Sequence, residues 1–178
     1  MTKHLNFSRI IVLSLLVVLA ASTRAIPLLI PHLWNFTAVG ALAIFAGAQF
    51  KDKWLAFLIP LAVMALSDLF IGYGFNTSVY IGFVLMVLCG FLIRKNVTVA
   101  NVGLASIGGA LIFFLITNFA YLYPETLYPH NFSGIIQSYI MGLPFLQNML
   151  IGDAIYGTVL FYGFHLLVKK YPALAVAK

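Results

Sequence analysis

Residues 78–122, SVYIGFVLMVLCGFLIRKNVTVANVGLASIGGALIFFLITNFAYL, contain the pattern that decides the fold of this chain. Two apolar runs, 78–93 and 99–122, are separated by a short polar segment that carries Arg94 and Lys95. A helix needs about 20 apolar residues to cross the hydrocarbon core of a bilayer, and these runs have close to that length. The stretch therefore predicts two membrane helices joined by a short basic turn.

The same pattern extends over the whole chain, which holds six apolar runs. They cover about residues 10–26, 36–50, 54–72, 78–93, 99–122 and 143–168. Mean hydropathy is +1.06 and only 8% of the 178 residues are charged, whereas about a quarter are charged in a soluble domain. We therefore predict an all-α, polytopic membrane protein, with six transmembrane helices in a compact bundle and a single domain over residues 1–178.

Lys and Arg residues gather at alternate connections between these runs. Nine of the ten are Lys3, Arg9, Lys51, Lys53, Arg94, Lys95, Lys169, Lys170 and Lys178. The other three connections hold only Arg24. Because cytoplasmic loops collect Lys and Arg, this split predicts that both termini are cytoplasmic and that three longer, aromatic-rich connections lie outside.

Composition and motifs also exclude several functions. There is no nucleotide-binding loop, so nothing in the sequence predicts ATP hydrolysis by this chain. The net charge of +6 lies in short caps that face anionic lipid, and we expect no nucleic-acid partner. The single cysteine, Cys89, excludes an internal disulfide and is expected to be a small buried residue. We predict no enzyme activity, no catalytic residues and no cofactor.

The N-terminal run has two interpretations. Lys3 and Arg9, an apolar stretch and Ala20-Ala21-Ser22 are the parts of a cleaved signal peptide. However, the apolar stretch continues past Arg24 to Ile30, and removal of this segment would leave five spans. We favour a retained first helix.

Small residues predict which helices lie at the centre of the bundle. The run 36–50 is rich in Ala and Gly, with Ala43 and Gly47 one turn apart, and the fifth run contains Gly103, Gly108 and Gly109. Small residues let helix backbones approach closely, so we expect the second and fifth spans to be central. The second run is short, so we expect it to begin before Phe36 or to lie deep in the bundle. We expect the sixth helix to begin after Pro144, which leaves a connection of over 20 residues after Tyr121.

Two acidic residues lie within predicted spans, where a charge that faces lipid is unfavourable by several kcal/mol. Asp68 is close to the outer end of its helix, and we expect it to bind a ligand, to cap the interface or to pair with Arg24. Asp153 is about nine residues, or roughly 13 Å, from Pro144 and therefore near the midplane. It either contacts a substrate or cation, or is satisfied by hydrogen bonds or protonation inside the bundle.

The predicted outer side gathers aromatic and amide side chains around these acids. The candidate substrate-binding residues are His32, Trp34, Asn35, Asp68, Asn118, Tyr123, His130 and Asp153, with Asp153 at the floor of the pocket. Aromatic planes and amide groups suit a pocket for a flat, polar small molecule. The same composition also makes an ordinary interfacial aromatic belt. The histidines and acids lack a metal-binding spacing such as H-x-x-x-H, so we predict no metal site.

Topology and local sequence resemble known families. Six short spans, a cytoplasmic N-terminus and three elaborate outer loops resemble the substrate-binding (S) components of energy-coupling-factor vitamin transporters. The stretch RAIPLLIPHLWNFTAVGALA at residues 24–43, with residues 66–69, 117–119 and 143–153, resembles a family of small bacterial membrane proteins labelled as transport proteins. This second resemblance covers nearly the whole chain and implies a multi-pass protein of the bacterial inner (plasma) membrane.

The S-component resemblance implies a function and a partner. Such components bind a vitamin-like small molecule with the loops after the first, third and fifth spans, and work with a transmembrane coupling protein driven by two ATPases. Docking uses small residues one turn apart on the first helix; Ala21 and Ala25 have that spacing but lie at its outer end, beside Arg24. Two alternatives remain: a small proton-coupled secondary transporter that relies on Asp153, and a membrane-embedded enzyme or assembly factor.

Overall fold

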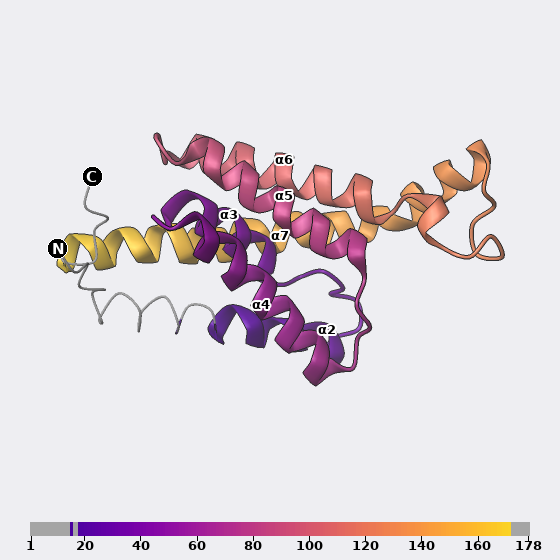
Figure 1. Ribbon diagram of the computed structural model, residues 1–178, viewed down its shortest axis with the longest axis horizontal. Coiled ribbons are helices and arrows are strands. Elements are labelled where there is room, and N and C mark those ends of the chain that lie inside the picture. The colour runs from indigo at the N-terminus through magenta and orange to yellow at the C-terminus, as the bar shows by residue number, and fades with distance from the viewer. Residues whose placement is uncertain (1–14, 16–17, 172–178) are drawn as a thin grey trace.

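The computed structural model describes residue 15 and residues 18–171, and all the regular structure in this part of the chain is helical (Figure 1). The elements are η1 (Thr23–Ala25), α2 (Ile26–Leu29), α3 (Val39–Gln49), α4 (Lys53–Ile71), α5 (Thr77–Ile93), α6 (Val99–Thr117), η2 (Ala120–Leu122) and α7 (Phe132–Lys170). The predicted all-α class is confirmed for these residues. Residues 10–14, 16 and 17 of the first predicted run, 10–26, lie outside them.

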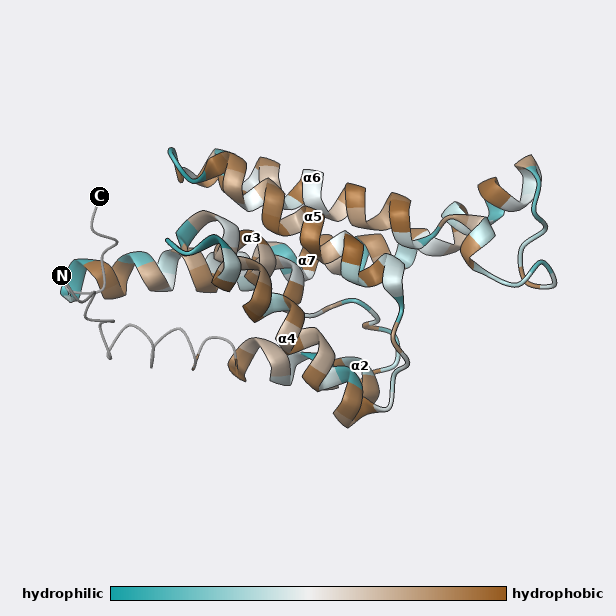
Figure 2. Ribbon diagram, viewed as in Figure 1, coloured by the Kyte–Doolittle hydropathy of each residue, from teal (hydrophilic) through white to brown (hydrophobic). Residues whose placement is uncertain are grey.

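Three of the helices, α4, α6 and α7, are long and apolar enough to cross a membrane. Val18–Leu29, Val39–Gln49 and Thr77–Ile93 are shorter apolar helices. Many large hydrophobic side chains on α4, α5, α6 and α7 are exposed, and Figure 2 shows brown segments along these helices. A surface of this kind is typical of a protein whose solvent is lipid.

The bundle has two chemically different ends. The basic end carries Lys51, Lys53, Arg94, Lys95, Lys169 and Lys170. The loop end is formed by three connections, residues 30–38, 72–76 and 118–131. The helices run between these two ends, so each cavity described below can be assigned to one of them.

Helix α3 is short and lies at the centre of the structure. Its 11 residues span about 16 Å, roughly half the thickness of a bilayer core. Every residue from Val39 to Ala48 is buried, and α3 contacts α4, α5, α6 and α7. Of the two predicted alternatives, the one in which this run lies deep in the bundle is confirmed, and the one in which its helix begins before Phe36 does not apply.

The late start of α3 has a local cause. Asn35 adopts a left-handed backbone conformation, with φ of 64°, which interrupts any helix and which asparagine tolerates better than most residues. The amide of Ala38 then donates to the hydroxyl oxygen of Thr23 at 2.8 Å instead of to a helical carbonyl. Irregular backbone at this depth is possible because it is packed against protein.

The closest neighbour of α3 is α5. A Cβ placed on Gly47 would lie 2.9 Å from the Cα of Gly90 and nearer still to the carbonyl oxygen of Val87. Gly90 meets Gly47 and the carbonyl of Ile44 in the same way. The prediction that the fifth run shares the centre with α3 is therefore wrong, and α5 takes that place.

Helix α6 lies further from the centre, as the open space around two of its glycines indicates. A Cβ placed on Gly103 or Gly108 would meet no other atom within 4 Å, and only Gly109 packs against Met86. Glycine lets another helix approach but does not require it to, so the composition of this run could not decide the matter.

Arg94 caps the buried C-terminal end of α3. Its Nε donates to the carbonyl of Gly47 at 3.1 Å, and a terminal guanidinium nitrogen donates to the carbonyl of Phe50. The last carbonyls of a helix have no partner within the helix, and a positive charge there also complements the helix dipole. Arg94, which from the sequence alone indicated only the orientation of the chain, therefore holds together the basic ends of α3 and α5.

Helix α7 begins at Phe132, earlier than expected, and the prediction that the sixth helix starts after Pro144 is wrong. The Asn131 side chain accepts a hydrogen bond from the amide of Gly134 at 3.0 Å and caps the helix. Pro144 lies inside it, where proline removes one backbone hydrogen bond without ending the helix. At 39 residues α7 is about 58 Å long, and its first turns extend beyond the rest of the bundle (Figure 1).

The Gly47–Gly90 contact generates a stability prediction. Replacing Gly47 by Leu forces α3 and α5 apart, and overpacking of this kind is unfavourable by about 1–3 kcal/mol or more. We expect a clear loss of folded protein in a detergent thermal-stability assay. Gly108→Leu is the matched control, because its Cβ enters open space; equal tolerance of the two variants would contradict this packing.

Candidate functional site

The loop end contains a cavity of about 310 Å³ in which all three connections meet. It is lined by Arg24, Pro27, Trp34, Asn35, Thr37, Met64, Tyr73, Asn76, Val79, Phe83, Phe113, Thr117, Asn118, Tyr123 and Phe145. This volume is at the lower end of the range for small-molecule sites, about 300–1,000 Å³. The lining combines aromatic rings, amides and one guanidinium group, which can bind a small molecule that has both flat and polar parts.

The connection that contributes Trp34 and Asn35 is held in place by α7. The Asn148 side-chain amide donates to the carbonyls of His32 and Trp34, at 2.9 and 3.0 Å. The left-handed conformation of Asn35 reverses the chain between these contacts and α3. Since these backbone bonds are made by α7, the Asn35 side chain is placed at the cavity by a rigid helix.

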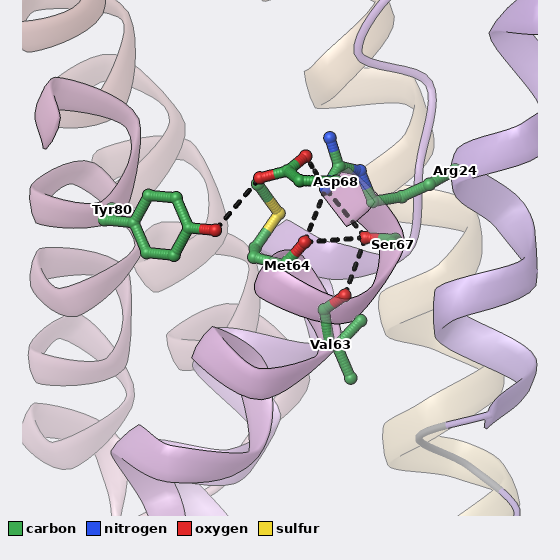
Figure 3. Close-up of polar contacts among 6 residues, drawn as sticks. All are labelled: Arg24, Val63, Met64, Ser67, Asp68 and Tyr80. Atoms are coloured by element: carbon green, nitrogen blue, oxygen red, sulfur yellow. Dashed lines mark hydrogen bonds and ion pairs between the residues drawn. The ribbon is translucent and has the colours of Figure 1, made fainter. Parts of the chain in front are cut away.

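Arg24 and Asp68 form an ion pair beside the cavity (Figure 3). The Nη1 of Arg24 lies 2.7 Å from Oδ1 of Asp68 and donates to the hydroxyl oxygen of Ser67 at 2.7 Å and to the carbonyl of Met64 at 3.2 Å. The hydroxyl of Tyr80 donates to Oδ2 of Asp68 at 2.9 Å. Both carboxylate oxygens are therefore paired, and the alternative in which Asp68 is a partner for Arg24 is confirmed.

This pairing also fixes the charge of the cavity. The side chains of Arg24 and Asp68 are 12% and 10% exposed, so the pair is shielded from solvent. The Arg24 guanidinium also lies over the Tyr73 ring, 5.9 Å from its centroid. Because Asp68 neutralises Arg24, this side of the cavity offers hydrogen-bond donors without a net charge.

Tyr123 and His130 are joined by the third connection. The Tyr123 hydroxyl donates to the carbonyl of Thr117 at 2.7 Å, and Nε2 of His130 lies 3.0 Å from the carbonyl of Tyr123. The His130 ring stacks on Tyr121, with centroids 4.5 Å apart. Burial raises the pKa of Tyr123, so its hydroxyl stays protonated at neutral pH and remains a donor.

The structure brings together half of the predicted substrate-binding residues. Trp34, Asn35, Asn118 and Tyr123 line the loop-end cavity. Asp68 acts behind it through Arg24. His32 is exposed, and its contact with α7 is made through its carbonyl. His130 stabilises the third connection and does not line the cavity, because its ring is stacked on Tyr121.

Asp153 does not form the floor of this cavity, and that prediction is wrong. The backbone of Phe36 and Thr37 lies between, against Gly152 of α7: a Cβ on Gly152 would be 3.3 Å from the Thr37 amide nitrogen. Asp153 instead lines a second cavity, of about 690 Å³, formed by α6, α7 and the C-terminal end of α3. His165 and Val168 also line this cavity, which therefore extends to the basic end.

The Asp153 carboxyl group lies at the first turn of α3. Asp153 is 1% exposed, and a Cβ on Gly40 would lie 2.9 Å from its Oδ2 and nearer still to Oδ1. The backbone amide of Ala41, in the same turn, is close enough to act on the carboxyl group electrostatically. However, no group in the described part of the chain has hydrogen-bond geometry to either oxygen. The carboxyl group therefore interacts with α3 through the positive end of the helix dipole.

Two residues with roles at these sites were not among the predicted ones. Arg24 lines the loop-end cavity, and its signal was present: it is the single basic residue in the predicted outer connections. Thr37 could not be found in this way, because nothing in the sequence places it where the chain turns into α3. Among the described residues, no group of three His, Cys, Asp or Glu side chains gathers to hold a metal ion.

Comparison with known proteins identifies a family for this chain, but the function of that family is not known. The model of a family of unknown function (DUF6580) matches residues 4–174. No curated protein matches the chain, and no solved structure matches it. The function must therefore be inferred from the arrangement of its own residues.

The contact between Gly40 and Asp153 can be tested with a double-mutant cycle. We expect Gly40→Ala to lower stability by about 1–3 kcal/mol, because the new methyl group occupies the space of the carboxylate. In an Asp153→Ala background the same change should have a much smaller effect. Thermal unfolding in detergent measures both, with Gly163→Ala as a control at an open position. An equal effect in the two backgrounds would show that Asp153 is not what Gly40 accommodates.

Proposed function

Since the chain belongs to DUF6580, a family of unknown function, we propose its function from its own geometry: the loop-end cavity binds a small, flat, polar molecule. The protein is then the substrate-binding component of a vitamin or micronutrient uptake system in the bacterial plasma membrane. The convergence of three separate connections on one cavity, with aromatic and amide side chains from each, carries this proposal.

The proposed topology has six spans, with both termini in the cytoplasm. Its support is the distribution of Lys and Arg, nine of which lie at one set of alternating connections. The basic end is then cytoplasmic, and the loop end with its cavity faces outward. A binding site on that side is accessible to a nutrient before transport.

The lining of the cavity indicates the class of molecule. Trp34, Tyr73 and Phe113 offer ring faces for stacking, while Asn35 and Asn118 offer amide donors and acceptors. Because Arg24 is neutralised by Asp68, a ligand needs no net charge to be accommodated. A cavity of about 310 Å³ suits a compact heterocycle with several polar substituents.

Uptake by such a component requires a partner that supplies energy. This chain has no nucleotide-binding loop, so the proposed partner is a transmembrane coupling protein with ATPases. Purification under mild conditions should then recover these proteins together with the chain. Recovery of the chain without them, and with full uptake activity, would favour a transporter that works alone.

A proton-coupled secondary transporter is the second candidate. One observation favours it: Asp153 is buried at the inner end of the basic-end cavity, without a charged partner in the part of the chain that the structure describes. Carboxyl groups of this kind inside membrane proteins often mark ion or proton paths. In that case uptake would depend on a proton gradient and not on ATP hydrolysis by a partner.

The topology predicts accessibility to a membrane-impermeant thiol reagent in intact cells. Cysteines introduced at Asn76 and His130 should react from outside, and one at Asp52 should react only after the membrane is opened. A Cys89→Ala background removes the native thiol. The reverse labelling pattern would place the loop-end cavity in the cytoplasm and remove it as a nutrient site.

The binding proposal predicts a small molecule retained by gently purified protein and detectable by mass spectrometry. Asn35→Gly should lower its occupancy several-fold, since each lost hydrogen bond weakens binding by about 1 kcal/mol or more. Glycine keeps the left-handed backbone that Asn35 adopts, so the connection should stay folded. Asn96→Ala, an exposed change at the basic end, is the control and should leave occupancy unchanged. Equal retention by all three proteins would exclude Asn35 from the site.

A further inference from the structure

The two cavities approach each other from opposite ends of the molecule. Thr37 lines the loop-end cavity and Asp153 lines the basic-end cavity. Between them, the backbone of Thr37 lies against Gly152, the residue before Asp153. The wall that separates the cavities at this point is therefore formed by the start of α3 and one short stretch of α7.

Asp153 differs from the other buried acid of this chain. Both oxygens of Asp68 are paired, with Arg24 and Tyr80, whereas neither oxygen of Asp153 has a hydrogen-bond partner among the described residues. Asp153 is also the more buried: as a whole residue it is 1% exposed, against 7% for the whole of Asp68. An ionised carboxylate in such a place is unfavourable unless something compensates its charge.

No side chain that the structure describes around Asp153 supplies that compensation. Helices α3 and α6, which pack against this part of α7, contain no titratable residue, and neither do residues 33–38. On α7 itself the nearest titratable groups toward the basic end are Tyr156, Tyr162 and His165. Helices α4 and α5 pack on the other sides of α3. The charged residue at the end of α5, Arg94, lies at the far end of α3, and Asp68 of α4 is already paired with Arg24.

The remaining compensation is the N-terminal end of α3, which carries roughly half a positive charge. This stabilises an ionised carboxylate only in part, and only while α3 stays against α7. A proton can neutralise the group instead, and it needs only one water molecule within hydrogen-bond reach of an oxygen. The basic-end cavity, with a volume of about 690 Å³, brings space for water up to this residue.

We propose that Asp153 is a proton-exchange site that takes up and releases a proton through the basic-end cavity. When Asp153 becomes protonated, a hydronium ion transfers its proton to one carboxylate oxygen. An O–H bond forms on Asp153, an O–H bond of the hydronium ion breaks, and a water molecule remains. Release is the reverse. The neutral acid no longer attracts the start of α3, so the protonation state is linked to the wall between the cavities. This inference does not require the loop-end cavity to bind a nutrient.

Dicyclohexylcarbodiimide tests the proposal in the unmodified protein. This apolar reagent adds the O–H of a protonated carboxyl group across its carbon–nitrogen double bond, and the adduct keeps every atom of both. We expect the peptide containing Asp153 to gain the mass of one reagent molecule. On the alkaline side of the titration, labelling should fall roughly tenfold per pH unit. Asp68, paired with Arg24, is the internal control and should stay unlabelled.

A pair of matched variants tests the path to Asp153. Gly103→Leu should slow labelling several-fold, because Gly103 lines the basic-end cavity and its new side chain enters open space. Gly108→Leu, an equally open position on the same helix outside the cavity lining, should have no effect. Val79→Phe, which fills the loop-end cavity, should also have none.

Each outcome decides the proposal. Absent or pH-independent labelling of Asp153 in the folded protein would overturn it, as would labelling of Asp68 to the same extent. Slower labelling in Val79→Phe but not in Gly103→Leu would show that Asp153 is reached from the loop end, and would overturn the proposed path. Size-exclusion chromatography and circular dichroism verify that each variant is folded. The labelling of Asp153 does not require nutrient binding, so it can fail or succeed independently of the proposed function.

Discussion

The rest of the structure depends on the burial of both ends of α3. A helix leaves its first amides and last carbonyls without internal partners, and those of α3 are surrounded by protein and not by water. Arg94 donates to the carbonyls at one end, while Thr23 accepts from the Ala38 amide and Asp153 faces the first turn at the other. Groups from three distant parts of the chain therefore converge on one 11-residue helix.

The shortness of α3 explains why there are two cavities and not one continuous core. Long helices such as α6 and α7 reach both ends of the bundle, but α3 fills only part of that length. On the loop side of α3, the irregular segment 30–38 and neighbouring side chains leave the 310 Å³ cavity. Toward the basic end, the open position of Gly103 on α6 contributes to the 690 Å³ cavity. The start of α3 lies between the two.

The two buried acids, Asp68 and Asp153, are stabilised in different ways, and each is suited to a different role. Asp68 is held by Arg24 and Tyr80 and shapes the loop-end cavity without adding net charge to it. Asp153 faces the N-terminal end of α3 and has no hydrogen-bond partner among residue 15 and residues 18–171. A paired charge is suited to structure, whereas an unpaired one is suited to exchange with a proton, because either of its two states is only partly stabilised.

Hydropathy and composition by themselves determined the helical class, the approximate limits of α4, α5 and α6, the burial of α3 and half of the candidate site, namely Trp34, Asn35, Asn118 and Tyr123. These depend on local pattern and on which connections lie together. Only the tertiary structure decided that α5 and not α6 packs on α3, that α7 passes through Pro144, and that Asp153 and Asn35 lie at different cavities. The physical reason is that a glycine, a proline or a buried acid has its effect through the atoms it meets, and those atoms belong to residues far away in the sequence.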